Sequence, residues 1–255
     1  MPYIQIRDLV KSFPRQGGQK EIVVDRFSLS IEKGEFVTLF GPNGCGKTTL
    51  LNVISGTSDW DSGSVSIADK PPQAARIGYV FQNFADSLFP WRTNLDNLAL
   101  PLELQRKSRR ERYRQVTDFL TNLDIKIELG KFPYQMSVGQ QQLIAIVRAL
   151  LYEPELLIMD EPFGSLDYTT RLNLEDQVLH IWEKSGATVL FVSHDVDEGI
   201  YLGERLVLLT KRPTHVAEVI ENALPRPRST VTFGSPEFAS MKARALSRFR
   251  QEVGG

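Results

Sequence analysis

Eight consecutive residues have the composition and spacing of a phosphate-binding loop. Residues 41–48 read GPNGCGKT, which fits the pattern G-x-x-x-x-G-K-[ST]. Glycines let successive backbone N–H groups turn toward a phosphate, Lys47 would reach the oxygens of the β- and γ-phosphates, and the Thr48 hydroxyl would bind Mg²⁺. An apolar run before the loop and a helical pattern after it favour this interpretation over a glycine-rich turn that holds a lysine by chance.

Two carboxylates follow an apolar run later in the chain. Residues 155–161 read ELLIMDE, so Asp160 and Glu161 would stand at the carboxyl edge of a buried strand, beside the phosphate loop. There Asp160 would hold the Mg²⁺ shell, and Glu161 would polarise the water that attacks the γ-phosphate. A strand that ends in surface acids is common by itself, but the phosphate loop favours the catalytic interpretation.

A third motif is weaker on its own. It consists of Ser137, Val138, Gly139 and Gln140. Ser137 suits the cap position of a helix, and Gly139 would leave backbone exposed for an anion. The same residues are typical of an ordinary capped helix start, so their weight comes from the order of the motifs along the chain.

The elements that must position these residues alternate between strand and helix. Apolar or alternating runs predict strands at residues 3–6, 27–31, 36–40, 64–67 and 77–81. After a helical stretch, strand patterns return at residues 156–159, 188–192 and 206–209, with a helix at 170–184. This alternation predicts an α/β fold with a mainly parallel sheet, interrupted by an inserted α-helical subdomain.

The length of the chain suits one large α/β domain with subdomains. We expect residues 1–228 to form this domain, with the helical subdomain inserted at about 83–152. Residues 229–255 are expected to form a C-terminal helical tail, in which residues 236–250 have the pattern of an amphipathic helix.

Composition excludes several classes of function. Cys45 is the one cysteine, which rules out an intrachain disulfide or a multi-cysteine metal site and suits a reducing compartment. The net charge of -1 gives no bulk attraction to nucleic acid. No run approaches the roughly 18 uninterrupted apolar residues of a membrane-spanning helix, and the N-terminus lacks the apolar core of a signal peptide. We therefore expect a chain that neither crosses a bilayer nor binds nucleic acid.

In this order the motifs resemble the ATPases of the ABC family, over nearly the whole chain. Six elements follow one another as in that family: the phosphate loop, Gln82 after a strand, the motif at 137–140, the acidic strand, Ser165-Leu166-Asp167, and His194. The resemblance implies a RecA-like P-loop NTPase core with an antiparallel β subdomain at the N-terminus, and it implies ATP and Mg²⁺ as cofactors. It also implies two composite sites at a dimer interface, where the 137–140 motif of one subunit closes over the ATP on the other subunit.

The resemblance also implies roles for single residues. Phe13 would stack on adenine, and Asp167 would link the two composite sites. His194 would contact the γ-phosphate and hold the attacking water with Glu161, so the implied catalytic residues are Lys47, Glu161 and His194. The implied Mg²⁺ ligands are Thr48, Gln82 and Asp160. The implied nucleotide-binding residues are Phe13, Gly41, Pro42, Asn43, Gly44, Cys45, Gly46, Lys47, Thr48 and Thr49.

Two positions depart from the family pattern. Val138 stands where the family usually has a glycine, and a β-branched residue disfavours positive φ, so the backbone there is either conventional or strained. Leu143 stands where an arginine is common. Ser137 and Gly139 keep the residue types that contact phosphate in the family. Neither departure removes a catalytic group, although either can weaken closure between subunits.

The segment after Gln82 indicates a branch of the family. LFPW at 88–91, LDN at 95–97 and LPRPR at 224–228 are similar to the importer ATPases for nitrate, sulfonate, taurine and bicarbonate. The resemblance implies a second ATPase subunit, with a homodimer expected, together with transmembrane permease subunits and, indirectly, a solute-binding protein. Gln82 would sense Mg²⁺ and nucleotide while it contacts the permease. The chain would be a peripheral subunit at the cytoplasmic face of the cell membrane that couples ATP hydrolysis to solute import.

Two local interpretations stay open. Near Gln82, apolar and aromatic side chains suit either a docking surface or packing of the helical subdomain. These side chains belong to Phe84, Leu88, Phe89, Pro90 and Trp91. The basic run at 106–114 fits either a solvated helix face or proximity to anionic headgroups and partner loops.

Two other functions compete with import. An ABC protein of DNA repair, chromosome organisation or translation would carry a long coiled-coil insertion or two fused ATPase units. Here the stretch between Gln82 and Ser137 is too short for such an insertion, and one phosphate loop is present. A phosphate-loop kinase or another non-ABC NTPase would leave the 137–140 motif and His194 without a role.

Overall fold

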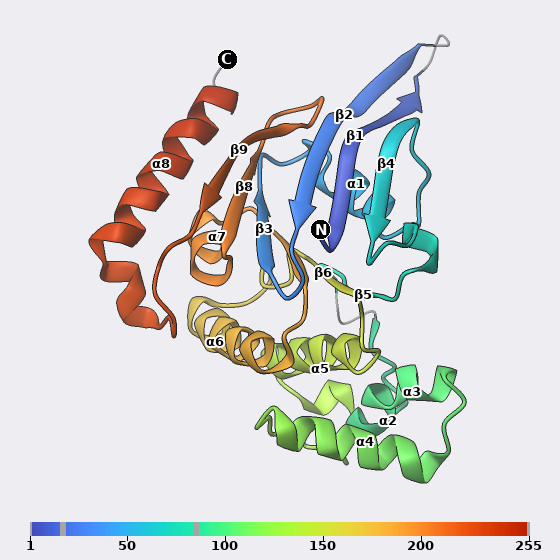
Figure 1. Cartoon of the computed structure of the whole chain (residues 1–255). Coiled ribbons are helices and arrows are strands. Elements are labelled where there is room, and N and C mark those ends of the chain that lie inside the picture. Colours follow the sequence, from blue (N-terminus) through green and yellow to red (C-terminus); the bar gives the residue numbers. More distant parts are fainter. Residues whose placement is uncertain (1, 16–18, 84–86, 254–255) are drawn as a thin grey trace. The chain divides into compact units, whose positions relative to one another are not determined.

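The structure, a computed structural model, describes residues 2–15, 19–83 and 87–253 (Figure 1). Two compact units make up the chain: unit 1 is Met1–Ala75 together with Thr188–Gly255, and unit 2 is Arg76–Ala187. Across the described ranges, no helix is both long and apolar enough to span a membrane.

Unit 1 contains a three-stranded antiparallel sheet. Its strands are β1 (Ile4–Pro14), β2 (Lys20–Ile31) and β4 (Ser62–Ile67), in the order β2-β1-β4 (Figure 1). In β2 the side chains of Phe27, Leu29 and Ile31 are buried and the serines between them are exposed, which is the alternation of a strand with one face on a core. The antiparallel β subdomain expected at the N-terminus is confirmed.

Mainly parallel strands form the second sheet region of unit 1. β7 (Val189–Ser193), β3 (Phe36–Phe40) and β8 (Arg205–Leu209) are parallel neighbours, and β9 (Val216–Glu221) pairs antiparallel with β8. All residues of β3 are buried, as in a strand covered on both faces. Helices α1 (Lys47–Ile54) and α7 (Val196–Leu202) follow β3 and β7. The strands predicted at 36–40, 188–192 and 206–209 are confirmed within one residue, whereas β9 and α7 were not predicted.

The chain after β9 belongs to unit 1 and ends in a long helix. α8 (Pro236–Val253) contacts α7, β8 and β9, and its Phe238 and Ala245 are buried. This helix confirms the amphipathic pattern at 236–250. Short 3₁₀ helices lie at Pro72–Ala74 and Thr230–Gly234.

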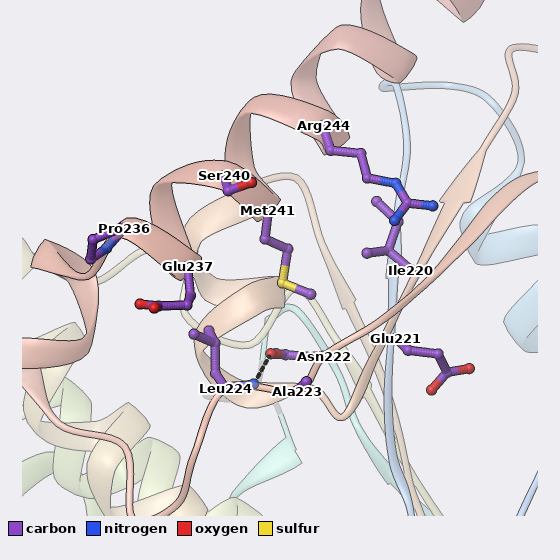
Figure 2. A pocket seen from close by; sticks show the side chains of 10 residues that line it. All are labelled: Ile220, Glu221, Asn222, Ala223, Leu224, Pro236, Glu237, Ser240, Met241 and Arg244. Carbon is purple, nitrogen blue, oxygen red and sulfur yellow. Dashed lines mark hydrogen bonds between the residues drawn. The ribbon is translucent and has the colours of Figure 1, made fainter.

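A pocket of about 480 Å³ opens between β9, the loop after it and α8 (Figure 2). Ile220, Asn222 and Met241 contribute to its lining, and the Asn222 side chain accepts a hydrogen bond from the N–H of Leu224 (3.1 Å). The lining contains none of the residues to which the motifs assign nucleotide or metal binding. The pocket is therefore separate from the candidate active site.

Unit 2 combines two parallel strands with a group of helices. The strands are β5 (Ile77–Val80) and β6 (Leu156–Asp160). The helices are α2 (Asn94–Leu98), α3 (Leu100–Leu104), α4 (Arg109–Asn122), a 3₁₀ helix at Pro133–Gln135, α5 (Val138–Leu150) and α6 (Tyr168–Ser185). α5 approaches β5 closely, because a Cβ atom at Gly78 would lie only 3.1 Å from the carbonyl oxygen of Ala149. The predicted helical insertion is confirmed.

Candidate active site

The loop between β3 and α1 has a backbone that requires glycine. Gly44 has a φ of 73° and Gly46 a φ of 123°, values that other residues rarely adopt. A Cβ atom at Gly46 would also lie 2.9 Å from Cγ1 of Val23 in β2. No side chain caps α1 by a hydrogen bond, so the positive end of its helix dipole is not offset by a capping group. This geometry is that of an anion-binding loop.

Lys47, the first residue of α1, holds its ammonium group over the loop. Its Nζ donates hydrogen bonds to the carbonyl oxygens of Gly41 (3.0 Å) and Pro42 (3.2 Å), and the residue is 7% exposed. A cation this deeply buried must be compensated by such partners. The loop therefore carries a fixed positive charge that can meet phosphate oxygens. Thr48 and Thr49 follow in the first turn of α1.

Cys45 is a packing residue of the loop. It is buried, and a Cβ atom at Gly41 would lie 3.4 Å from its Sγ. Burial raises the pKa of the Cys45 thiol, which keeps it protonated near neutral pH. A protonated, buried thiol is a poor redox switch, so the structure supports a role in filling space.

His194 stands on a rigid turn at the same sheet edge as the phosphate loop. It follows β7, whose last residue, Ser193, is the register partner of Phe40 at the end of β3. Ser193 Oγ donates to Glu198 Oε2 (2.5 Å) and accepts from the N–H of Asp195 (2.9 Å). Asp195 in turn caps α7. His194 itself is exposed, so its imidazole can reach a ligand from a fixed support.

Phe13 lies near the end of β1, where it pairs with Glu21 of β2. It is 42% exposed, and Nζ of Lys11 lies 5.0 Å from its ring centroid. An exposed aromatic ring on a paired strand offers a flat surface on which a base can stack. Unit 1 thus holds the predicted adenine platform, the phosphate loop and His194.

Unit 2 brings Gln82, Asp160 and Glu161 to one strand edge. Val80, near the end of β5, pairs with Met159, so the residues that follow both strands leave the same edge. The hydroxyl of Tyr79 donates to Asp160 Oδ2 (3.3 Å), and burial together with this carboxylate raises the pKa of Tyr79 well above its usual range.

Glu161 departs from ordinary backbone geometry. Its φ is 46°, in the left-handed region, where a residue with a side chain is disfavoured by about 1 kcal/mol. Strain of this kind is concentrated at functional sites, because the surrounding structure must hold it in place. Glu161 shares a positive φ with Asp8, Asp69, Asp124 and Glu153, so the strained backbone agrees with a functional role and does not by itself identify one.

The 137–140 motif forms the start of α5. Ser137 Oγ accepts from the N–H of Gln140 (3.3 Å), and Gln140 Oε1 accepts from the N–H of Ser137 (3.0 Å), which together make a capping box. Val138 is the first helical residue, so of the two expected backbones the conventional one is found. The residue is 50% exposed. Leu143, in place of the usual arginine, is buried in the apolar face of α5.

The expectation that Gly139 exposes its backbone is wrong. Gly139 is buried, and a Cβ atom there would lie 2.7 Å from Cγ2 of Thr170 in α6. The missing side chain lets the first turns of α5 and α6 approach each other. Asp167 caps α6 by accepting from the N–H of Thr170 (3.0 Å). Hydrogen bonding to Thr170, first through its side chain and then through its N–H, lowers the pKa of Asp167. Ser137 and Asp167 therefore cap two neighbouring helix starts.

Two residues that contact the phosphate loop were not predicted from the sequence. Arg212 and Thr214, after β8, donate hydrogen bonds to the carbonyl oxygens of Gly44 and Cys45. They belong to no motif, and nothing in the sequence relates them to a loop so far away along the chain. Phe84, one of the residues considered for docking, lies outside the described residues.

Comparison with known proteins decides the family. Residues 24–164 match the family model described as ABC transporter, a stretch of more than half of the chain. This chain belongs to the ABC transporter family. The matched residues of this ABC ATPase include the phosphate loop, Gln82, the 137–140 motif and the acidic strand.

Curated relatives match along almost the full chain. The aliphatic sulfonates import ATP-binding protein of Bacillus subtilis is 40% identical over 92% of this chain and 90% of that protein. The protein of the same description from Bacillus cereus is 38% identical over 99% of this chain and 97% of that protein. A solved structure of a dimeric ATP-binding cassette in a post-hydrolysis state, bound to ADP and phosphate, has a TM-score of 0.71 and 28% identity over 87% of this chain and 100% of that chain. The chain is accordingly an ATP-binding subunit and an ATPase.

Proposed function

We propose that this ABC ATPase couples ATP hydrolysis to the import of a small anion. Aliphatic sulfonates are the first candidates, and nitrate, taurine and bicarbonate are the alternatives. The proposal is supported chiefly by the near full-length identity, 38% and 40%, to two relatives described as aliphatic sulfonates import ATP-binding proteins. The solute itself would be selected by permease subunits and a solute-binding protein.

Unit 1 is proposed to bind ATP, with adenine on Phe13 and the phosphates in the loop at 41–48. Lys47 would face the β- and γ-phosphate oxygens, on which negative charge is spread during phosphoryl transfer. A buried, pre-oriented ammonium stabilises such charge without reorganising at the moment of reaction. The hydrogen bonds from Lys47 to the carbonyl oxygens of Gly41 and Pro42 hold the ammonium group in the orientation that this role requires.

The hydrolytic step is proposed to use Glu161 and His194. Glu161 would accept a proton from the attacking water, and His194 would hold that water and the γ-phosphate. The proposed Mg²⁺ ligands are Thr48, Gln82 and Asp160. Their hydroxyl, amide and carboxylate oxygens are the hard donors that Mg²⁺ prefers, and the ion would neutralise phosphate charge there.

Two copies of the chain are proposed to complete the site. The starts of α5 and α6, capped by Ser137 and Asp167, would face the nucleotide bound by a second copy. The dimeric state of the ADP-bound structural neighbour supports this arrangement. Half-exposed Val138 would then lie at the contact between subunits.

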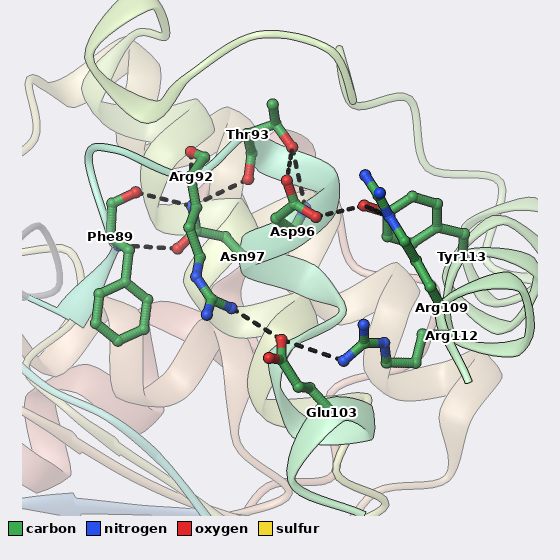
Figure 3. Close-up of polar contacts among 9 residues, drawn as sticks. All are labelled: Phe89, Arg92, Thr93, Asp96, Asn97, Glu103, Arg109, Arg112 and Tyr113. Carbon is green, nitrogen blue, oxygen red and sulfur yellow. Dashed lines mark hydrogen bonds and ion pairs between the residues drawn. The ribbon is translucent and has the colours of Figure 1, made fainter. Parts of the chain in front are cut away.

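The permease is proposed to dock on a rigid aromatic segment of unit 2. Trp91 is 72% exposed, and its ring centroid lies 5.3 Å from that of Phe89. The buried Asn97 amide holds the segment, because Oδ1 accepts from the N–H of Phe89 (2.8 Å) and Nδ2 donates to its carbonyl oxygen (3.1 Å) (Figure 3). Leu88 is buried, so the segment packs inward through Leu88 and presents Trp91 outward. A peripheral position at the cytoplasmic face of the membrane follows from this docking.

The basic run at 106–114 contributes to local structure. Arg112 Nη1 lies 3.2 Å from Glu103 Oε2, and Arg109 Nε donates to the hydroxyl of Tyr113 (3.0 Å) (Figure 3). These contacts join α4 to α3 and connect residues within α4. They favour a solvated helix face over binding to lipid headgroups.

Purification of the chain with its membrane partners tests the proposal. The complex is reconstituted in vesicles, and candidate anions with their binding proteins are screened for stimulation of ATP hydrolysis. Trp91→Ala should abolish copurification of a polytopic membrane protein and leave basal hydrolysis unchanged. Leu104→Ala, which alters an apolar residue that is 74% exposed on α3, is the matched control. Copurification with ribosomes or DNA, and with no membrane protein, would contradict the proposal.

A further inference from the structure

The segment after β8 crosses the outer side of the phosphate loop in unit 1. Thr214 is fully buried, and its Oγ1 donates a hydrogen bond to the carbonyl oxygen of Cys45. Arg212 Nη2 donates to the carbonyl oxygen of Gly44 (3.1 Å). Two consecutive peptide groups of the loop are therefore held from outside.

This segment is itself fixed on two sides. Toward β2, the N–H of Thr214 donates to the carbonyl oxygen of Val23 (2.8 Å), and the carbonyl of Thr214 accepts from the N–H of Asp25 (3.0 Å). Toward β8, the N–H of Thr210 donates to the carbonyl oxygen of His215 (3.1 Å). Because both neighbours are paired strands, the segment is a rigid support for the loop.

We propose that Arg212 and Thr214 are positioning residues that hold the phosphate loop in its anion-binding shape. In a trans peptide, the carbonyl and the N–H that follows it point in opposite directions. Since the carbonyl of Cys45 faces Thr214, the N–H of Gly46 is directed to the inner side of the loop. Since the carbonyl of Gly44 faces Arg212, the N–H of Cys45 is also directed inward, where it reaches the carbonyl oxygen of Pro42 at 3.3 Å.

Arg212 also connects the loop to the strands that carry Phe13. Its Nη1 donates to Glu21 Oε1 (3.0 Å), and Glu21 is the register partner of Phe13. Both charged side chains are 41% exposed, so the ion pair contributes little to stability, and its effect is to set the position of the loop relative to β2. The inference rests on the proposed function of the loop and Phe13 in nucleotide binding.

Thr214→Val tests the inference, because valine keeps the shape of threonine and removes the donor to Cys45. We expect the Kd of the full-length chain for ADP, measured by calorimetry, to rise about tenfold. Thr214→Ser keeps the hydroxyl and should stay within about twofold of the original Kd. The affinity of the valine variant for inorganic tripolyphosphate, measured by competition with ADP, should fall by the same factor, because the affected contacts are to phosphate.

Thermal unfolding of the nucleotide-free variants separates positioning from stability. A lowered Tm of Thr214→Val with an unchanged Kd for ADP would show a purely structural role and overturn the inference. Lys47→Ala reports on the site itself. If this variant binds ADP like the original chain, the proposed nucleotide site is wrong. If it loses ADP binding while Thr214→Val keeps it, only the positioning role is wrong.

Arg212→Gln tests the second contact. It should raise the Kd for ADP about threefold, less than Thr214→Val, because the guanidinium is partly exposed. The matched control is Arg250→Gln, which removes one exposed positive charge from α8. Equal effects of the two arginine variants would assign the loss to net charge and overturn the role of Arg212.

Discussion

The helix starts of α1 and α5 are both proposed to face phosphate, yet they are built differently. α1 follows glycines with left-handed backbone, has no capping side chain and begins with Lys47. α5 begins with a capping box in which Ser137 and Gln140 satisfy each other's N–H groups. The start of α1 offers a ligand a positive charge and a backbone of defined shape, whereas the capping groups at the start of α5 bond to each other within the chain. We infer that one chain can bind nucleotide through unit 1, while the α5 start contributes only across a subunit contact.

The largest effect on activity should come from Glu161, which is proposed to act in ATP hydrolysis and not in ATP binding. Glu161→Gln should bind ATP normally and hydrolyse it about 10²–10⁴-fold more slowly, because the proton acceptor for the attacking water is lost. Single-turnover hydrolysis and equilibrium binding of ATP measure the two steps. Hydrolysis at the original rate would remove Glu161 from its proposed role and leave the strained backbone there unexplained.

A pair of variants tests the comparison of the two helix starts. Lys47→Ala should weaken ADP binding by the single chain more than about 100-fold, since charge-assisted hydrogen bonds to phosphate are lost. Ser137→Arg should leave that binding within about twofold and still abolish most ATP hydrolysis. Calorimetry with ADP and a phosphate-release assay give the two readings. Equal losses of ADP binding would break the comparison.

The close contact between α5 and α6 predicts a smaller effect on stability. Gly139→Ala should lower the free energy of unfolding by about 1 kcal/mol, because the new methyl group meets Thr170 and the gain in helix propensity offsets only part of the clash. Urea unfolding measures this change. Adding Thr170→Ser removes the opposing Cγ2 and should restore stability. A destabilised double variant would assign the cost to some other contact.

The smallest effect concerns the pH dependence of the α6 start. Hydrogen bonds from the side chain and the N–H of Thr170 lower the pKa of Asp167 in the folded chain. The contribution of Asp167 to stability is therefore present above its unfolded pKa and is lost as pH falls through the folded value. Asp167→Asn keeps the cap and removes the titration. Acid unfolding curves below about pH 4 should therefore be flatter in the variant. Curves of identical slope would contradict the assignment.

Most of the fold could be predicted from local sequence patterns. β3 was predictable because five consecutive apolar or β-branched residues lie between turn signals, and α5 because its apolar residues repeat at helical spacing. β9 was not predicted, since Ile220 is its only buried residue and glutamates lie among its apolar residues. A strand of that kind is defined by its pairing with β8, which is a long-range property.

The features of the candidate site also divide into those that local sequence patterns predict and those that depend on long-range contacts. The phosphate loop and the acidic strand are contiguous motifs whose chemistry depends on residue type, so the sequence identified them. The burial of Gly139 depends on Thr170 in another helix, and the outer contacts of the loop depend on Arg212 and Thr214. The positive φ of Glu161 has no signature at all in the sequence. Tertiary contacts and strain were therefore visible only in the structure.

Mixing two inactive variants tests most directly whether the site is shared between two copies. Lys47→Ala damages the phosphate loop, and Ser137→Arg damages the α5 start, so each variant alone should hydrolyse little ATP. In a mixed pair, the intact loop of the Ser137→Arg chain meets the intact α5 start of the Lys47→Ala chain. We predict that ATPase activity returns on mixing and rises with total concentration. Activity that stays absent at every ratio, while each variant still binds as predicted, would contradict the shared site.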